Sequence, residues 1–247
     1  MDKQKRGRIA LVLFVLIPIG LYFLWSKAEE TFIPLEYMGS YYTDTSLLAD
    51  KALIDSTLGD NYYVTGDSIM EIWSLRDFEL TDQTGNPISL KTFENKILVA
   101  NFFYATCPEL CPRMNNNLRL AVEAFKDDPE VAFLSHTVHP EHESVPVLAE
   151  YAKQYNYAPD KWYFATGFKH EIYDLAINHY NAAAPSPDGK YDFIHSTMAF
   201  LVDKELRIRG YFEAHNNPTF ATDVKNGIKG LQAEYAIKEK KASDQKR

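Results

Sequence analysis

The only two cysteines of this 247-residue chain are the residues best suited to chemistry. Cys107 and Cys111 follow the apolar run 97–104 directly and precede a helical pattern. Their spacing of four places both sulfurs on the first turn of the predicted helix, where backbone N–H groups and the helix dipole favour thiolates. A pair of thiols in this position is either a redox pair or a pair of soft metal ligands.

The metal alternatives differ in the number of ligands they require. Soft thiolates select Cu(I), Zn²⁺ or iron–sulfur clusters. The cysteines are too few for a cluster, and a structural zinc site requires a closed set of protein ligands. Cu(I) accepts fewer, so two thiolates and one imidazole would serve. The best third ligand is His195, which stands just before a predicted strand. The alternative is a histidine that caps the strand end through a backbone hydrogen bond.

The elements that must position these residues follow a clear order from residue 71 onward. Residues 77–90 alternate around a Gly-Asn-Pro turn and predict a β-hairpin. Strands are predicted at 96–104, 131–138, 161–166, 197–202 and 208–212, and helices at 112–125, 144–155, 168–180 and 218–235. Alternating strands and helices predict a mainly parallel sheet covered on both faces, and the closing hairpin adds an antiparallel part. Ligands of such sheets gather at the carboxyl ends of strands, where the cysteines lie.

The N-terminal region indicates export. Residues 9–25 form an uncharged apolar run, preceded by four basic residues and long enough for a transmembrane helix. The basic side is expected to stay in the cytoplasm. A cleaved signal peptide is the alternative, but Trp25 and Lys27 make a poor cleavage site. We therefore expect an uncleaved anchor in a bacterial cytoplasmic membrane, with the soluble domain facing the periplasm or cell exterior.

Composition limits the remaining classes of function. A hydrophobic fraction of 46% supports a real core, and the net charge of −8 argues against nucleic acid as a partner. The predicted organisation is a cytoplasmic tail at 1–8, the anchor at 9–25, a stalk or extension at 26–70, one domain at 71–236 and a charged tail at 237–247. We expect the charged tail to be disordered.

The cysteine segment resembles a known family. The stretch Cys107-Pro108-Glu109-Leu110-Cys111-Pro112 behind an aromatic strand is similar to the Cys-Pro-x-x-Cys-Pro signature of the Sco (SenC) copper proteins. His195-Ser196 before an apolar strand resembles the metal-binding histidine of that family. The similarity covers roughly residues 72–232. It implies an α/β fold, with a thioredoxin-like central sheet flanked by helices and an N-terminal β-hairpin. It also implies copper, as Cu(I), Cu(II) or both, bound by Cys107, Cys111 and His195.

The resemblance further implies a task and a partner. Sco proteins deliver copper to the binuclear copper site in subunit II of cytochrome c oxidase, or reduce the cysteines of that site. Two departures stand out. The family reads Asp-Pro-Glu-Arg-Asp where this chain has the stretch His139-Pro140-Glu141-His142-Glu143, and it commonly has Asp where this chain has Ile194. Both departures remove carboxylates expected near the metal, where such groups orient the ligands and tune the affinity.

Other residues admit simpler interpretations. His136, His139 and His142 are spaced by three and offer a second metal site, but polar residues on a solvated loop are the preferred interpretation. Met114 and Met198 are expected in the core rather than as copper ligands. The aromatic cluster at 102–104 is expected in the core as well.

The sequence leaves two principal functions open. The first is a membrane-anchored copper chaperone, which passes copper to cytochrome c oxidase subunit II or to another copper or thiol protein. The second is a thiol–disulfide oxidoreductase, in which Cys107 and Cys111 form the redox-active pair and His195 is dispensable. Three intervening residues argue against ordinary thioredoxin chemistry. A peroxidase is the last alternative. That chemistry needs a hydroxyl group and an arginine beside a reactive cysteine, and Thr106 and Arg113 lie near Cys107. Their spacing does not match the pattern, so this function ranks third.

Overall fold

The computed structural model describes residues 35–42, 62–65, 68–155, 160–182 and 196–246. The chain divides into the units Met1–Pro34 and Leu35–Arg247, and all described residues belong to the second. The expected tail at 1–8, the expected anchor at 9–25 and His195 therefore lie outside the described residues. Within the ranges described, no helix has the length and apolar character needed to cross a bilayer.

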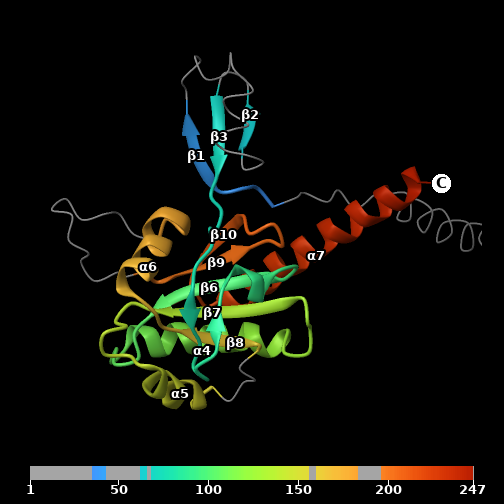
Figure 1. Ribbon diagram of the computed structural model, residues 1–247. Coiled ribbons are helices and arrows are strands. Elements are labelled where there is room, and N and C mark those ends of the chain that lie inside the picture. The colour runs from blue at the N-terminus through green and yellow to red at the C-terminus, as the bar shows by residue number, and fades with distance from the viewer. Residues whose placement is uncertain (1–34, 43–61, 66–67, 156–159, 183–195, 247) are drawn as a thin grey trace, which may run out of the picture. The chain divides into compact units, whose positions relative to one another are not determined.

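A five-stranded mixed sheet in the order β10-β9-β6-β7-β8 forms the centre of the domain (Figure 1). The strands are β6 (Ile97–Phe103), β7 (Val131–Thr137), β8 (Trp162–Ala165), β9 (Met198–Val202) and β10 (Ile208–Glu213). β6, β7 and β8 are parallel, whereas β9 runs antiparallel to β6 and to β10. This confirms the predicted mixture. Every residue of β6 and β7 is buried, as expected for central strands covered on both faces.

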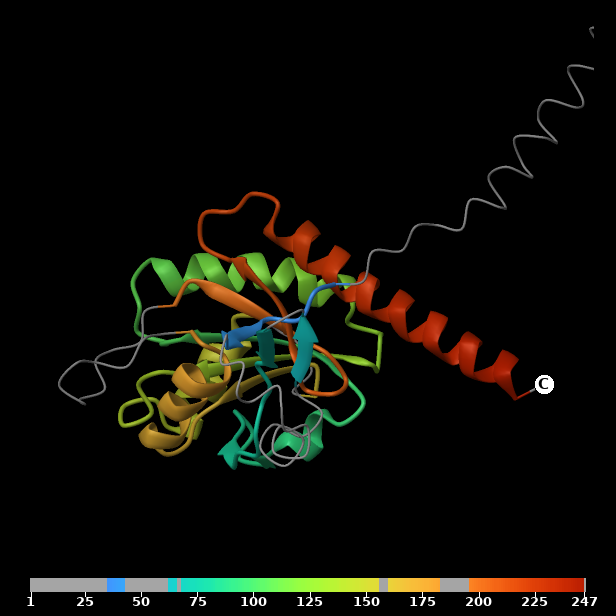
Figure 2. The ribbon, with the colours of Figure 1, turned by 90° about the horizontal axis from the view of Figure 1, so that it is seen from above.

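Helices cover both faces of this sheet. They are α4 (Leu110–Ala124), α5 (Val145–Lys153), α6 (Lys169–Asp174), its π-helical continuation η2 (Leu175–His179) and α7 (Phe220–Gln245). One core lies between the sheet and the buried sides of α4, α5 and α7, and the other lies under α6 and η2. Figure 2 shows α4 and α7 together on one side of the sheet and α6 on the other. The α/β architecture expected from the sequence is confirmed.

The predicted hairpin is present but short. β4 (Leu80–Thr81) pairs antiparallel with β5 (Pro87–Ile88), and the single turn η1 (Leu90–Phe93) follows. Asp82 fixes the connection by accepting the backbone N–H groups of Thr84 and Asn86 at 2.8 and 3.0 Å. Gly85 adopts a φ of 85° there, which other residues rarely tolerate. The hairpin, with η1, packs against the same core as α6.

The region expected as a stalk contains a second sheet. β1 (Gly39–Tyr42), β2 (Tyr62–Thr65) and β3 (Ser68–Ile72) pair antiparallel in the order β1-β3-β2. Backbone hydrogen bonds near its base connect it to the main domain. The N–H of Met38 donates to the carbonyl of Ile208 at 3.0 Å, and the N–H of Ile208 donates to Trp73 at 2.8 Å.

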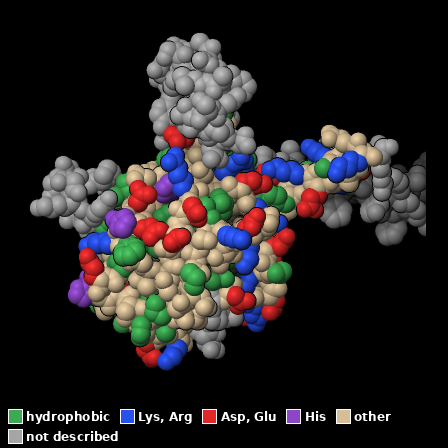
Figure 3. All heavy atoms as spheres, in the orientation of Figure 1, with side chains coloured by type: hydrophobic (Ala, Val, Ile, Leu, Met, Phe, Trp, Pro, Cys, Tyr) green, Lys and Arg blue, Asp and Glu red, His purple; other side chains and the backbone are tan. Residues whose placement is uncertain are grey.

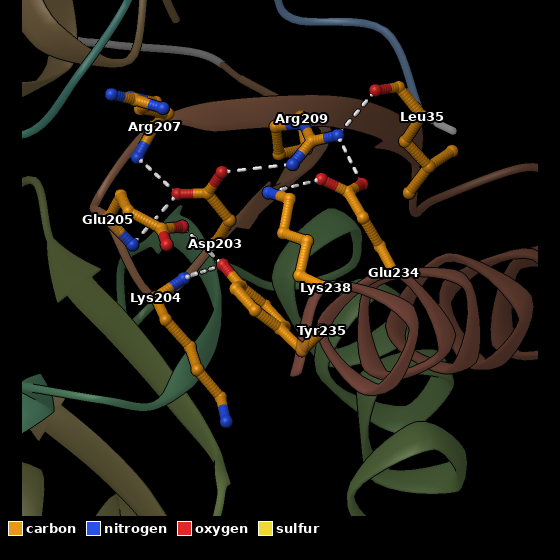
Figure 4. Close-up of polar contacts among 9 residues, drawn as sticks. All are labelled: Leu35, Asp203, Lys204, Glu205, Arg207, Arg209, Glu234, Tyr235 and Lys238. Atoms are coloured by element: carbon orange, nitrogen blue, oxygen red, sulfur yellow. Dashed lines mark hydrogen bonds and ion pairs between the residues drawn. The ribbon is translucent and has the colours of Figure 1, made fainter. Parts of the chain in front are cut away.

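A buried ionic cluster ties the start of the described chain to α7 (Figure 4). Arg209 of β10 donates to Asp203 at 3.0 Å and to Glu234 of α7 at 2.8 Å, and also to the carbonyl of Leu35. The Arg209 and Asp203 side chains are 1% and 0% exposed. Charges this deeply buried need such pairing, so the cluster fixes how these segments meet.

α7 runs much further than expected. The tail at 237–247 was predicted to be disordered, yet the helix continues to Gln245. Lys238 pairs with Glu234 one turn earlier at 2.8 Å, and the following residues are mostly Ala, Glu and Lys, which are strong helix formers. The expected disorder is wrong because the charged residues here are strong helix formers, and their charge does not prevent the helix from continuing.

Candidate metal centre

The thiols lie at the carboxyl end of the central strand β6, where the ligand site was predicted. The strand ends at Phe103, and α4 begins at Leu110 with Glu109 as its N-cap residue. Cys107 therefore lies in the turn before the helix, and only Cys111 lies in its first turn. The expectation that both cysteines would be helical is wrong for Cys107. A proline disfavours helical backbone in the residue before it, as at Cys107 before Pro108, but this effect alone does not decide, because Cys111 is helical although Pro112 follows it.

The two sulfurs lie close together without a disulfide bond. The backbone N–H of Cys111 donates to the sulfur of Cys107 at 3.3 Å. Burial acts to raise the pKa of Cys107, but hydrogen bonds from the N–H groups of Cys111 and Glu109 and from the Tyr104 side chain outweigh it, so the pKa is lowered. The prediction that the helix N-terminus favours a thiolate is confirmed for Cys107.

The same prediction is wrong for Cys111. Burial raises the pKa of its thiol to about 12, and the nearby Cys107 adds to the rise. A hydrogen bond from the backbone of Tyr104 offsets this only in part. The pair therefore combines one sulfur that ionises more easily than an ordinary thiol with one that keeps its proton at neutral pH.

Both cysteines line one small cavity. Its volume of about 30 Å³ suits a single ion or water molecule. Other walls come from Leu110 and Met114 of α4 and from Ser196 and Thr197, just before β9. The fold thus brings a segment from late in the chain to the thiols. Among the described residues, no group of three His, Cys, Asp or Glu side chains could hold a metal. His195 directly precedes Ser196 in sequence, and its role as third ligand stays a prediction.

Tyr104 belongs to the site, although it was expected in the core. Phe102 and Phe103 are buried as predicted, but Tyr104 is only half-buried and lines the thiol cavity. A hydrogen bond between its side chain and Cys107 raises the pKa of the Tyr104 hydroxyl. Its position at the strand end, just before the cysteine turn, was the available signal.

Glu143 is a second residue that the sequence did not reveal. It is 0% exposed and accepts hydrogen bonds from the backbone N–H of Ala105 and from the hydroxyl of Thr137. The departure from the family pattern at 139–143 was interpreted as a loss of carboxylates. Glu143 occupies the last position of that stretch and keeps a carboxylate, which contacts the cysteine turn rather than the thiols.

The three histidines of the hypothetical second site do not act together. His136 is fully buried on β7, where its ring stacks on Phe102 at 5.0 Å, and burial lowers its pKa to about 3. The interpretation as a solvated loop residue is therefore wrong for His136. His139 and His142 lie beyond the strand with ring centroids 4.2 Å apart. Met114 is buried in one core, as predicted, and Met198 is partly buried and packs against the other.

The molecular surface offers a larger pocket away from the thiols. It has a volume of about 520 Å³ and is lined by acidic side chains with His170 and the exposed Phe168. It shares no lining residue with the thiol cavity. On the face in Figure 3, acidic and basic side chains are interspersed over the described part of the surface, as on an ordinary solvated surface. The thiol cavity, and not this larger pocket, is the candidate metal site.

Known proteins resemble this chain in sequence. The SCO1/SenC family model matches residues 73–229. A SCO1 protein homolog of Bacillus subtilis is 26% identical over 159 residues, which are 62% of this chain and 82% of that protein. A mitochondrial SCO2 homolog of Danio rerio is 28% identical over 160 residues, or 62% of this chain and 56% of the other.

Solved structures show the same fold. A SCO1/SenC family lipoprotein from Bacillus anthracis has a TM-score of 0.57 at 24% identity, covering 65% of this chain and 95% of that one. Bradyrhizobium japonicum ScoI with copper bound has a TM-score of 0.52 at 24% identity, covering 63% and 98%. The thioredoxin-like architecture is therefore shared. Because the family model spans more than half of the 247 residues, the chain belongs to the SCO1/SenC family.

Proposed function

We propose that the chain is a membrane-anchored copper chaperone, which holds one copper ion through Cys107, Cys111 and His195. The observation that carries the proposal is the shared cavity, where both thiols meet Ser196. His195 directly precedes Ser196 in the sequence, which supports its assignment as the third ligand. Relatives with the same fold include Bradyrhizobium japonicum ScoI with copper bound.

The electronic character of the site suits Cu(I). Thiolates are soft ligands, and the lowered pKa of Cys107 makes its sulfur the easier of the two to ionise. Cys111 keeps its proton in the metal-free protein and must release it when copper binds. An imidazole from His195 would complete a trigonal set. The Cys111 proton makes copper affinity fall as the pH falls.

Transfer requires that a partner can reach the ion. Leu110 lines the cavity and is 41% exposed, and Pro108 and Glu109 beside it are also exposed. A thiolate or imidazole of the partner can enter there while the other ligands still hold copper, so the ion is never released to water. The partner we propose is subunit II of cytochrome c oxidase, because a solved relative is described as a member of the Sco family of cytochrome c oxidase assembly proteins.

Residues 9–25 are proposed to anchor this domain in the cytoplasmic membrane. Their apolar character and the basic residues before them support this topology. The Bacillus anthracis relative is described as a lipoprotein, which is another means of membrane attachment. The domain would then face the periplasm or the cell exterior, where it could meet an acceptor of copper.

The proposal is tested by Cu(I) titration of the reduced full-length chain in detergent, in competition with a chromogenic Cu(I) chelator. Wild type should bind one copper per chain. Cys107→Ser, Cys111→Ser and His195→Ala should each weaken binding strongly. His170→Ala removes an exposed histidine from the unrelated pocket and should change nothing. Wild-type affinity in His195→Ala would refute the three-ligand site.

The unequal thiols also favour a second candidate, thiol–disulfide exchange. The Cys107 thiolate would attack a partner disulfide and form a mixed disulfide, releasing one partner thiolate. Cys111 would then lose its proton and attack the Cys107 sulfur. This step releases the second partner thiolate and leaves a Cys107–Cys111 disulfide. The solved relative from the family of cytochrome c oxidase assembly proteins is also described as having a disulfide switch. In a disulfide-reduction assay, His195→Ala would keep full activity and Cys111→Ser would accumulate the mixed disulfide.

A further inference from the structure

A buried carboxylate links the cysteine turn to the neighbouring strand. Glu143 stands between β7 and α5 and is completely buried. Its Oε1 accepts the N–H of Ala105 and lies 3.4 Å from the nitrogen of Thr106. Its Oε2 accepts the hydroxyl of Thr137, the last residue of β7. One side chain therefore holds the two residues that directly precede Cys107.

The contacts around Glu143 define its orientation. The hydroxyl of Thr137 accepts the N–H of His139 at 3.0 Å, which directs its own proton towards the carboxylate. The N–H of Glu143 donates to the carbonyl of His139 at 3.0 Å. A buried polar group is costly unless it is hydrogen-bonded, and the two oxygens of a carboxyl group can accept several donors at once. The described contacts of this carboxylate are all with donors, so the side chain is held in one position.

We infer that Glu143 is a positioning residue of the metal site: it holds the turn 105–106 so that the Cys107 sulfur stays at the start of α4, beside Cys111. A single peptide bond separates Thr106 from Cys107. A shift of about 1 Å in this turn would take the Cys107 sulfur beyond hydrogen-bonding distance of the Cys111 N–H, now 3.3 Å away. The consequence for copper rests on the proposed function, whereas the consequence for the thiols does not.

Four variants separate this role from a general contribution to folding. Glu143→Ala removes both acceptor oxygens, whereas Glu143→Gln keeps the shape and one of them. Thr137→Val leaves Glu143 in place and removes the hydroxyl that orients it, so it tests the same contact if Glu143→Ala fails to fold. The matched control is Glu141→Ala. Glu141 is an exposed carboxylate two residues earlier, which pairs with Lys169 at 3.3 Å.

The experiment compares these variants in the full-length chain in detergent, first without metal. Hydrogen exchange is followed on peptides covering the cysteine turn and on peptides covering β6 and β7, and the reduction potential of the cysteine pair is measured in redox buffers. In Glu143→Ala the turn should exchange at least about tenfold faster while β6 and β7 keep their protection. The reduction potential should shift in Glu143→Ala and stay at the wild-type value in Glu141→Ala. The Cu(I) affinity of Glu143→Ala should fall roughly ten- to hundredfold. The affinities of Glu143→Gln and Thr137→Val should lie between those of Glu143→Ala and wild type.

Three results would overturn the positioning role of Glu143. If Glu143→Ala folds and its turn exchanges like that of Glu141→Ala, the inference is overturned. It is also overturned if β6 and β7 lose protection as much as the turn, because the role is then structural only. If Glu143→Ala does not fold, unchanged exchange of the turn in Thr137→Val overturns it. If wild type binds no copper, the proposed function fails, while the exchange and potential measurements still test the positioning role.

Discussion

The backbone N–H of Cys111 donates a 3.3 Å hydrogen bond to the sulfur of Cys107, and this contact, together with the deeper burial of Cys111, makes the two cysteines chemically unequal. Cys107 receives N–H groups from the start of α4, whereas Cys111 lies deeper and loses its proton with difficulty. Cys107 would therefore be the first of the two to bind a metal ion or to attack a partner disulfide. The order of events at the site follows from this difference.

The difference predicts separate pH profiles for the two thiols. In the reduced, metal-free chain, Cys107 should be alkylated below the pH at which an ordinary thiol reacts, because its pKa is lowered. Cys111 should react appreciably only as the pH approaches about 12, because burial raises its pKa. Brief iodoacetamide pulses at increasing pH, followed by peptide mass spectrometry, measure both sites in one sample. Equal rates at both cysteines across the range would contradict this account.

His136 predicts a pH dependence of folding stability. Its pKa falls from 6.5 to about 3 on burial, so the folded chain favours the neutral ring. The stabilisation is present above pH 6.5 and is lost as the pH falls towards 3, because the unfolded chain takes up the proton first. The loss amounts to at most about 5 kcal/mol.

The measurement is urea unfolding of wild type and His136→Gln between pH 7 and 4. Other groups titrate in this range, so the difference between the two proteins is the relevant quantity. Wild type should lose more stability than His136→Gln on acidification, and the gap should widen steadily below pH 6.5. Parallel profiles would show that His136 is not buried in the neutral form.

The position of the thiols could be predicted because the residues next to them in the sequence indicate it. The apolar run before Cys107 indicated a buried strand, and Pro108 and Pro112 marked the turn into a helix. The pairing of β6 with β9 was less accessible, because residues about a hundred positions apart are neighbours there. Sequence patterns give the elements, and only long-range packing gives their neighbours.

Glu143 and His136 could not be placed from the sequence for the same reason. His136 lies near the polar end of β7, and Glu143 lies in the polar loop after that strand. A local sequence pattern does not distinguish a solvated side chain from a buried one at such positions. Glu143 is buried because the backbone N–H groups of the cysteine turn, about forty residues earlier in the chain, donate hydrogen bonds to its carboxylate. His136 is buried because Phe102 of the adjacent strand and Tyr180 after η2 enclose its ring.

The ionic cluster around Arg209 predicts a large effect on stability. Arg209→Met leaves the fully buried Asp203 without its cation, which should lower the free energy of unfolding by about 3 to 5 kcal/mol. The matched control is Lys126→Met, which breaks an ion pair with Glu123 whose partners are 51% and 53% exposed, and it should cost less than about 1 kcal/mol. Urea unfolding measures both. Equal effects would contradict the assignment of Arg209 as the residue that ties α7 to the start of the described chain.

The central claim is that two sulfurs and one imidazole share a single copper ion. X-ray absorption at the copper edge, on the reduced full-length chain loaded with one Cu(I), counts these ligands directly. We predict two sulfur scatterers and one nitrogen scatterer in wild type, with the nitrogen lost in His195→Ala and retained in His170→Ala. A spectrum with the same nitrogen scatterer in wild type and His195→Ala would contradict the account.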